Sequence, residues 1–211
     1  MNVSESWQFF VSGALLGFTA GVSPGPLLAL VISETLMHGR KEGILVSTAP
    51  VFTDLPIIFM TVFLLLKIFV SDIFLGLISL AGAGFIGYLA CKNIMIGGMH
   101  MHIRHAKPQS LRKGVIANFL NPHPYLFWMT IGGPIILKAF RADIFPAALF
   151  LTGFYLLLVG SKIIIALIVN RSKSFLQSNM YAYIIKATGI ILLFFAGMFL
   201  KEGLILLGVK W

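Results

Sequence analysis

Charged residues are scarce in this chain of 211 residues. Only 11% of them are charged and only 7 are Asp or Glu, whereas 58% are hydrophobic. Ordinary soluble domains contain roughly 25% charged and 45–50% apolar residues. So little charge cannot cover a water-facing surface, which excludes a soluble enzyme, a nucleic-acid-binding module and a disordered regulator. Because long apolar runs recur throughout and the mean hydropathy is +0.96, we expect an all-α integral membrane protein whose surroundings are the lipid bilayer.

Cysteine is nearly absent as well, since Cys91 is the only one. A single thiol excludes redox transfer through paired membrane cysteines. The net charge of +9 would suggest a nucleic-acid partner for a soluble protein, but here the basic residues lie mostly between apolar runs, so no nucleic-acid partner is expected. The first apolar run starts near Trp7, is too long for a signal peptide and follows no basic residue, so we expect a retained span.

Six apolar runs are long enough to cross the bilayer, which takes a helix of about 20 residues. The expected spans are 7–36, 43–66, 73–98, 115–137, 144–169 and 182–208. The linkers are short except for 99–114, and no soluble domain fits between the runs. Residues 1–211 are therefore expected to form a single transmembrane domain with several passes.

Basic residues are biased towards one side of these spans. The linkers after the first, third and fifth spans contain eight Lys and Arg residues, three more lie within spans nearer that side, and five belong to the other side. The positive-inside rule places the richer side in the cytoplasm and both termini outside.

The spans divide into two groups of three, at about 1–98 and 115–211, with the basic linker 99–114 between them. An odd number of spans per unit forces a second copy to lie upside down, so we expect two inverted three-helix repeats. Both first spans contain helix breakers: Ser23-Pro24-Gly25-Pro26 and Asn121-Pro122-His123-Pro124. Inverted repeats with interrupted helices are typical of transporters, with the substrate site near the midplane where the repeats meet.

The first break should unwind its span, because proline removes a backbone donor and glycine adds conformational freedom. Unpaired backbone groups are tolerated at membrane depth only against protein or a wet cavity. The hypothesis is a substrate site at Ser23, Pro24, Gly25 and Pro26; the alternative is a structural kink.

The second break offers Asn118, Asn121 and Pro122 as site candidates. Asparagine has donors and acceptors for a zwitterionic or amide-bearing ligand. The alternative is a capped helix start of no functional significance. His123 lies beside this break, and its residue type alone assigns it no role.

Asp54 is the only carboxylate deep within an expected span. An acid at that depth is costly and suggests proton coupling or binding of a substrate ammonium. The alternative is a structural partner for Lys162 or the backbone. Lys162 itself is expected to snorkel to the membrane surface; the alternative is a pair with Asp54 or with a substrate carboxylate. Glu34 is expected to pair with Arg40 or Lys41.

Two further patterns are weaker. Gly13, Gly17 and Gly21 have the spacing of close helix packing, either within the chain or at a dimer seam. Three histidines lie in the basic linker without Cys, Asp or Glu beside them, so no metal site and no cofactor are expected. They are His100, His102 and His105.

Four motifs resemble those of the LysE/RhtB family of amino-acid exporters, and their order covers nearly the whole chain. They are Gly21-Val22-Ser23-Pro24-Gly25-Pro26, the Gly39–Gly43 turn, the glycine-rich run from Gly82 to Leu89, and Gly114–Pro122 with its Asn-Pro step. The resemblance implies a six-helix carrier of a prokaryotic plasma (inner) membrane that exports amino acids or derivatives, not an enzyme, often as a homodimer. It also assigns the Pro-Gly-Pro and Asn-Pro residues to two halves of one site.

The chain departs from the family pattern at two positions. Leu27 stands where a polar residue often follows Pro-Gly-Pro, and His123 where Lys often follows Asn-Pro. The expected function is secondary export of an amino acid or related metabolite by alternating access. The alternatives are a divalent-cation exporter of the wider superfamily and a non-transporting membrane scaffold or sensor.

Overall fold

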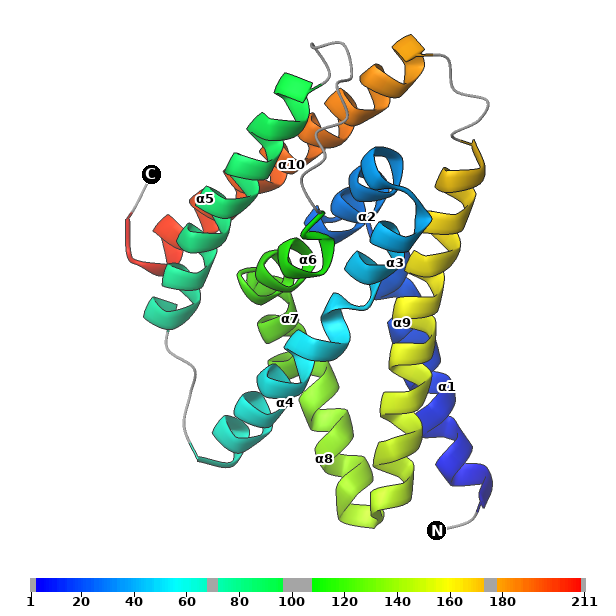
Figure 1. The fold of residues 1–211 in the computed structure, drawn as a ribbon. Coiled ribbons are helices and arrows are strands. Elements are labelled where there is room, and N and C mark those ends of the chain that lie inside the picture. The colour runs from blue at the N-terminus through cyan, green and yellow to red at the C-terminus, as the bar shows by residue number, and fades with distance from the viewer. Residues whose placement is uncertain (1–2, 68–71, 97–107, 173–177, 210–211) are drawn as a thin grey trace.

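The computed structural model describes residues 3–67, 72–96, 108–172 and 178–209. All regular secondary structure in these ranges is helical (Figure 1). The elements are α1 (Val3–Val22), α2 (Pro26–His38), α3 (Arg40–Ser47), α4 (Ala49–Lys67), α5 (Asp72–Ile96), α6 (Ser110–Phe119), α7 (Pro122–Phe127), the π-helical turn η1 (Trp128–Gly132), α8 (Gly133–Ala142), α9 (Ile144–Ser172) and α10 (Ser178–Leu206). The expected all-helical class is thus present.

Four helical segments of the described chain are long and apolar enough to cross a membrane: Arg40–Thr61, Gly76–Met95, Ile144–Ser172 and Tyr183–Leu206. The α1–α2 pair is a fifth if its two parts are one bent span. The expected span at 115–137 is instead broken between α6 and α7 and then continues through the π-helical turn η1 into α8, and it is not among these candidate spans. A count of six spans therefore stays a prediction.

Span 1 breaks where the sequence predicts. α1 ends at Val22, α2 begins at Pro26, and the two meet at 62°. Pro24 and Pro26 have no N–H to donate to the carbonyls of Ala20 and Val22, four residues earlier. The α-helical hydrogen-bond ladder therefore cannot continue through the break.

The second break separates α6 from α7 at Leu120 and Asn121, again just before a proline. Farther along, Pro134 has no N–H for the carbonyl of Thr130, and a π-helical turn lies just before it. A proline therefore lies at the break and at the π-helical turn of this segment.

α1 packs along α9 through a seam of glycines. A Cβ added at Gly13 would lie 2.1 Å from the Phe150 carbonyl oxygen, and one at Gly17 would lie 2.1 Å from that of Phe154. Gly21 faces the Ser161 side chain on the same helix. Of the two interpretations of the Gly13, Gly17 and Gly21 spacing, the structure therefore shows close packing of two helices within one chain.

α5 and α10 form the other long pair, lying side by side in Figure 1. They run antiparallel, since Gly76 faces Leu207 near one end and Asn93 donates to Thr188 near the other. The broken segments α2, α6 and α7 lie between this pair and the α1–α9 pair, so that the centre of the molecule is made of helix ends (Figure 1).

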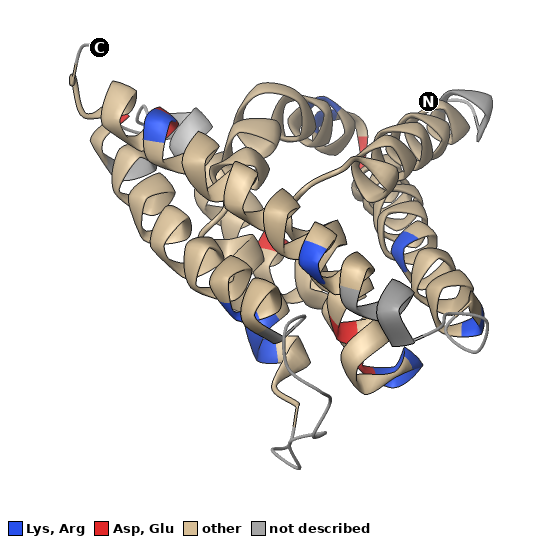
Figure 2. Ribbon diagram, turned by 90° about the horizontal axis from the view of Figure 1, so that it is seen from above, with Lys and Arg blue, Asp and Glu red and all other residues tan. Residues whose placement is uncertain are grey.

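The outer faces suit lipid. Many large apolar side chains are exposed, among them Phe59, Ile164 and Phe194. Charged positions are few along the ribbon (Figure 2). In Figure 1, the ends of α5 and α9 that lead into basic linkers lie at the upper end, and the start of α1 lies at the lower end. These features describe a multi-pass helical membrane protein.

Glu34 does not pair with Arg40 or Lys41, and this expectation is wrong. Its buried carboxylate lies 2.5 Å from Lys113 Nζ and accepts a hydrogen bond from Ser110 Oγ at 2.5 Å. Both of these partners are on α6, which packs against α2. Arg40 and Lys41, which follow α2 in the sequence, are exposed.

Candidate functional site

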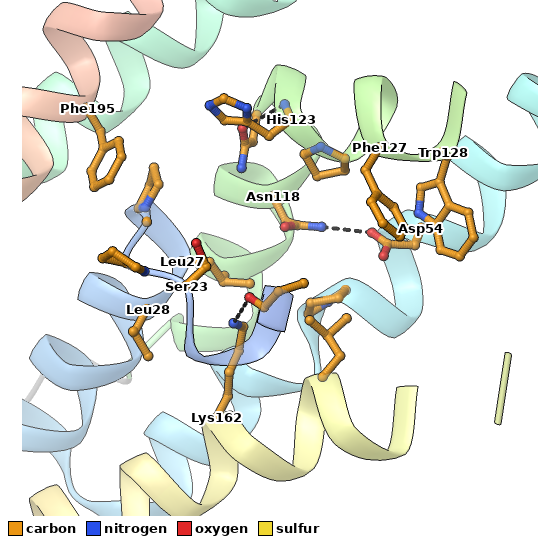
Figure 3. Close-up of a pocket in the computed structure, with 18 of the residues that line it drawn as sticks. Ser23, Leu27, Leu28, Asp54, Asn118, His123, Phe127, Trp128, Lys162 and Phe195 are labelled. Carbon is orange, nitrogen blue, oxygen red and sulfur yellow. Dashed lines mark hydrogen bonds between the residues drawn. The ribbon is translucent and has the colours of Figure 1, made fainter. Parts of the chain in front are cut away.

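A cavity of about 450 Å³ lies where the two helix breaks meet (Figure 3). Its lining comes from both halves of the chain: Ala20, Ser23, Pro24, Gly25, Pro26, Leu27, Leu28, Pro50, Asp54, Asn118, Asn121, His123, Pro124, Phe127, Trp128, Phe154, Leu158, Lys162, Phe195 and Met198. Ligand cavities commonly measure about 300–1,000 Å³. The space is therefore sufficient for a small metabolite.

Seven of the eight residues proposed from the sequence line this cavity: Ser23, Pro24, Gly25, Pro26, Asp54, Asn118 and Asn121. Pro122 does not; it is buried in the first turn of α7. Residues separated by nearly a hundred positions thus come together at one place, and a role in binding remains a proposal.

Asp54 is buried on α4 and is held by the end of α6. Asn118 Nδ2 donates to Asp54 Oδ1 at 3.0 Å and to Thr53 Oγ1 at 2.6 Å. Thr53 Oγ1 lies 3.3 Å from the same carboxylate oxygen. This cluster of three side chains links the second span of the first half to the interrupted helix of the second half.

Lys162 does not snorkel, and that expectation is wrong. Its side chain is only 3% exposed, and its ammonium donates to the carbonyl oxygens of Gly21 at 2.7 Å and Ala20 at 3.3 Å (Figure 3). The Ala20 carbonyl lacks a helical donor because Pro24 has no N–H. A cation at a helix C-terminus is also favoured by the helix dipole. The break in α1 therefore creates the acceptors that hold Lys162 inside.

Asp54 and Lys162 do not form a direct ion pair. They both line the cavity and attract each other across it. The alternative in which Asp54 is a structural ion-pair partner of Lys162 is therefore wrong for a direct contact.

Asn121 is the N-cap of α7. Its Oδ1 accepts the backbone N–H of His123 at 3.0 Å. The Phe119 carbonyl accepts the Tyr125 hydroxyl at 2.9 Å, which satisfies another group near the break. The side-chain oxygen of Asn121 therefore caps the helix, as the alternative interpretation predicted. Asn121 also lines the cavity. The ring of His123 lies against Phe199, with ring centres 5.8 Å apart.

Two buried donors near Asp54 have no hydrogen-bond partner within the described structure: Trp128 Nε1 and the Tyr155 hydroxyl. Both interact electrostatically with the Asp54 carboxylate without meeting hydrogen-bond geometry. An unpaired buried donor is costly. A change of carboxylate rotamer, water or a polar ligand would satisfy them.

The sequence arguments missed the apolar wall of the cavity. On α9, Phe154, Leu158 and Lys162 recur every four residues and so share one face. Phe127 and Trp128 lie three and four residues after Pro124, which places them on its face. These spacings were visible in the sequence, but every long apolar helix offers several such faces, and only tertiary packing selects one.

No group of three or more His, Cys, Asp or Glu side chains capable of holding a metal occurs in the part of the chain that the structure describes. The linker residues His100, His102 and His105 lie outside the described residues. Chemically, the cavity offers one buried acid, one buried amine, the amides of two asparagines, a serine hydroxyl, an imidazole and a large apolar surface.

Comparison with known proteins agrees with the motifs. The family model for LysE type translocators matches residues 18–203, which is most of the chain and includes both helix breaks. No significant match was found among curated proteins or solved structures. The chain therefore belongs to the LysE type translocator family, whose members are membrane transporters that export amino acids or related compounds.

Proposed function

We propose that this protein is a secondary transporter that exports amino acids or related small metabolites across the plasma membrane of a prokaryote by alternating access. One observation carries the proposal: two proline-broken helices, one from each half of the chain, meet at a cavity that contains a buried acid and a buried amine. Interrupted helices around a central site are a recurrent plan in secondary transporters.

The packing pattern supports two inverted repeats of three spans. If a pseudo-two-fold axis relates the two halves, any packing of the first span of one half on the second span of the other must occur twice. α1 packs on α9, and α6, η1 and α8 pack on α4, as such an axis requires. The third spans, α5 and α10, pair with each other in antiparallel fashion, which an inverted axis also demands.

The substrate site consists of the cavity-lining residues of both breaks with Asp54 and Asn118. The Asp54 carboxylate binds either the transported proton or the ammonium of the substrate. Asn118 and Asn121 orient polar groups of the substrate, and Pro122 fixes the start of α7. The two halves rock about this site, and a second copy of the chain completes a homodimer.

Counterflow in proteoliposomes tests the proposal. Purified protein is reconstituted, vesicles are loaded with one unlabelled compound, and uptake of its labelled form is followed for a panel of amino acids and for divalent metals. Saturable exchange of an amino acid is expected, with empty liposomes as control. Metal flux without amino-acid flux would replace the proposal with a cation exporter, and absence of all flux in folded protein would favour a scaffold or sensor.

A further inference from the structure

The amine of Lys162 has one donor to spare. An ammonium has three N–H bonds, and two of them are directed to the carbonyls of Ala20 and Gly21. No third acceptor is present among the described residues. Lys162 lines the cavity while being only 3% exposed. The unused N–H is therefore available to an anionic group inside the cavity.

Asp54 occupies the corresponding place in the other half. It lies on α4, the second span of the first half, and holds the end of α6 through Asn118. Lys162 lies on α9, the second span of the second half, and holds the end of α1. Each half therefore contributes one charge that holds the interrupted helix of the other, and the two charges have opposite signs (Figure 3).

The two opposite charges line one cavity but do not contact each other. A ligand with one positive and one negative group could pair with both of them. Removing charges from water is costly unless they are compensated. A zwitterion places its carboxylate on the amine and its ammonium on the acid, so both poles gain a partner together. A third charge on the ligand would find no second carboxylate, lysine or arginine among the residues that line the cavity, where His123 is the one other titratable side chain.

The rest of the wall decides which side chain the ligand has. Large apolar residues make up much of the lining, among them Leu27, Phe127, Phe154, Leu158, Phe195 and Met198. Burial of apolar groups against such a wall is favourable, and methionine adapts to different shapes. A cavity of about 450 Å³ has room for a large side chain beside the two charged groups.

Building on the proposed export function, we propose that the substrates are neutral amino acids with large apolar side chains, such as leucine, methionine and phenylalanine. Lys162 binds their carboxylate, Asp54 binds their ammonium, and the apolar wall around Leu27 receives the side chain. Lysine, glutamate and small polar amino acids are poor substrates of this site.

Competition against labelled leucine in counterflow tests whether the site needs both the carboxylate and the ammonium of its substrate. Methionine and phenylalanine should compete, whereas lysine and glutamate should compete at least tenfold less well. Two leucine analogues, 3-methylbutylamine without the carboxylate and 4-methylpentanoate without the amine, should each lose at least tenfold. Exchange of lysine or threonine without leucine would overturn this assignment and leave amino-acid export standing; absence of any amino-acid exchange would overturn export itself.

Lys162→Met tests the carboxylate partner. The KM for leucine should rise at least tenfold, and the tenfold preference for leucine over 3-methylbutylamine should disappear, because the carboxylate no longer has its partner. Lys92→Met is the matched control, since Lys92 is exposed on α5 and does not line the cavity. An unchanged preference in folded Lys162→Met would overturn the role of Lys162.

Leu27→Asn keeps the test decisive if Lys162→Met fails to fold. It leaves both charges in place and makes the wall polar next to the break. The ratio of kcat/KM for leucine to that for threonine should fall at least tenfold in the folded variant, and this ratio does not depend on how much folded protein the buried substitution leaves. An unchanged ratio would overturn the assignment of the apolar wall.

Discussion

Lys113 Nζ lies 2.5 Å from Glu34 Oε1, and this ion pair joins α6 to α2 on the side of the break away from α1. Glu34 is 2% exposed as a side chain and Lys113 is 20% exposed. The two broken spans are thus connected to each other outside the cavity. Because the carboxylate is buried and the ammonium is partly exposed, removing one partner should cost a different amount of stability from removing the other.

Lys113→Met should destabilise the protein more than Glu34→Gln does. Loss of the lysine leaves a carboxylate buried without its counter-charge, at a cost of about 3 kcal/mol. Loss of the carboxylate leaves a lysine that can turn to water, at a cost of about 1 kcal/mol. Thermal unfolding of both variants in the same detergent measures the difference. A larger loss in Glu34→Gln would contradict this account of the pair.

Gly17→Ala should separate α1 from α9. The added methyl group would lie 2.1 Å from the Phe154 carbonyl oxygen, so one backbone must move, at a cost of about 1–3 kcal/mol. Gly160→Ala is the control on α9, because a Cβ there meets nothing within 4 Å. Melting temperature and oligomeric state by light scattering are measured together. If Gly17→Ala changes only the oligomeric state, the seam lies between two chains.

Substitutions of Asn121 distinguish its cap from its contact with substrate. Asn121→Ala removes the acceptor for His123 N–H and should cost about 1 kcal/mol of stability. Asn121→Ser retains a capping oxygen and should keep the melting temperature within a few degrees. Both variants should raise the KM for substrate, because neither has the amide donor. Full transport by Asn121→Ser would show that the side chain only caps α7.

Asp54→Asn should weaken export, because the substrate ammonium loses its partner, and should abolish the response of the remaining export to a proton gradient. The amide cannot exchange a proton, so export should no longer accelerate when the outside is made acidic. Other titratable groups near Asp54 are Tyr125, Tyr155, Lys162 and His123.

Efflux from proteoliposomes under a series of imposed pH gradients measures this response. His123→Gln is the control for the other cavity group and should keep the response to acid. Full efflux by Asp54→Asn with an unchanged pH dependence would remove Asp54 from the coupling mechanism.

Much of the architecture follows from local chemistry. Apolar runs must form helices in lipid, because no water is present to pair with the backbone. Prolines must interrupt those helices, so the break at Pro24 and the break before Pro122 were both predictable. The same argument identified Asp54 as an unusual acid, because so few charges lie within the apolar runs.

The division of residues 115–137 into short helices was predictable only in part. The Asn-Pro step signals one break, but the π-helical turn before Pro134 also depends on Gly132 packing against the Trp128 ring. Apolar composition alone therefore favoured a single span, whereas the packed chain has a break at Leu120 and Asn121 and a π-helical turn at Trp128–Gly132.

The side-chain partners of the site depended entirely on tertiary structure. Lys162 looks from the sequence like a residue that snorkels, because a lone lysine in an apolar helix usually reaches the surface. It stays inside because α1, more than a hundred residues earlier, ends beside it with unpaired carbonyls. Glu34 likewise pairs with Lys113, not with its sequence neighbours, because α6 packs on α2.

The sequence by itself determined the lipid environment, the helices and the positions of their breaks, because each depends on backbone hydrogen bonding within a few residues. Tertiary structure alone decided that Asp54 and Lys162 line one cavity, each attached to the interrupted helix of the opposite half. Hydropathy and proline spacing contain no information on which helices meet. That choice is made by packing, such as the close approach of α1 and α9 at Gly13 and Gly17.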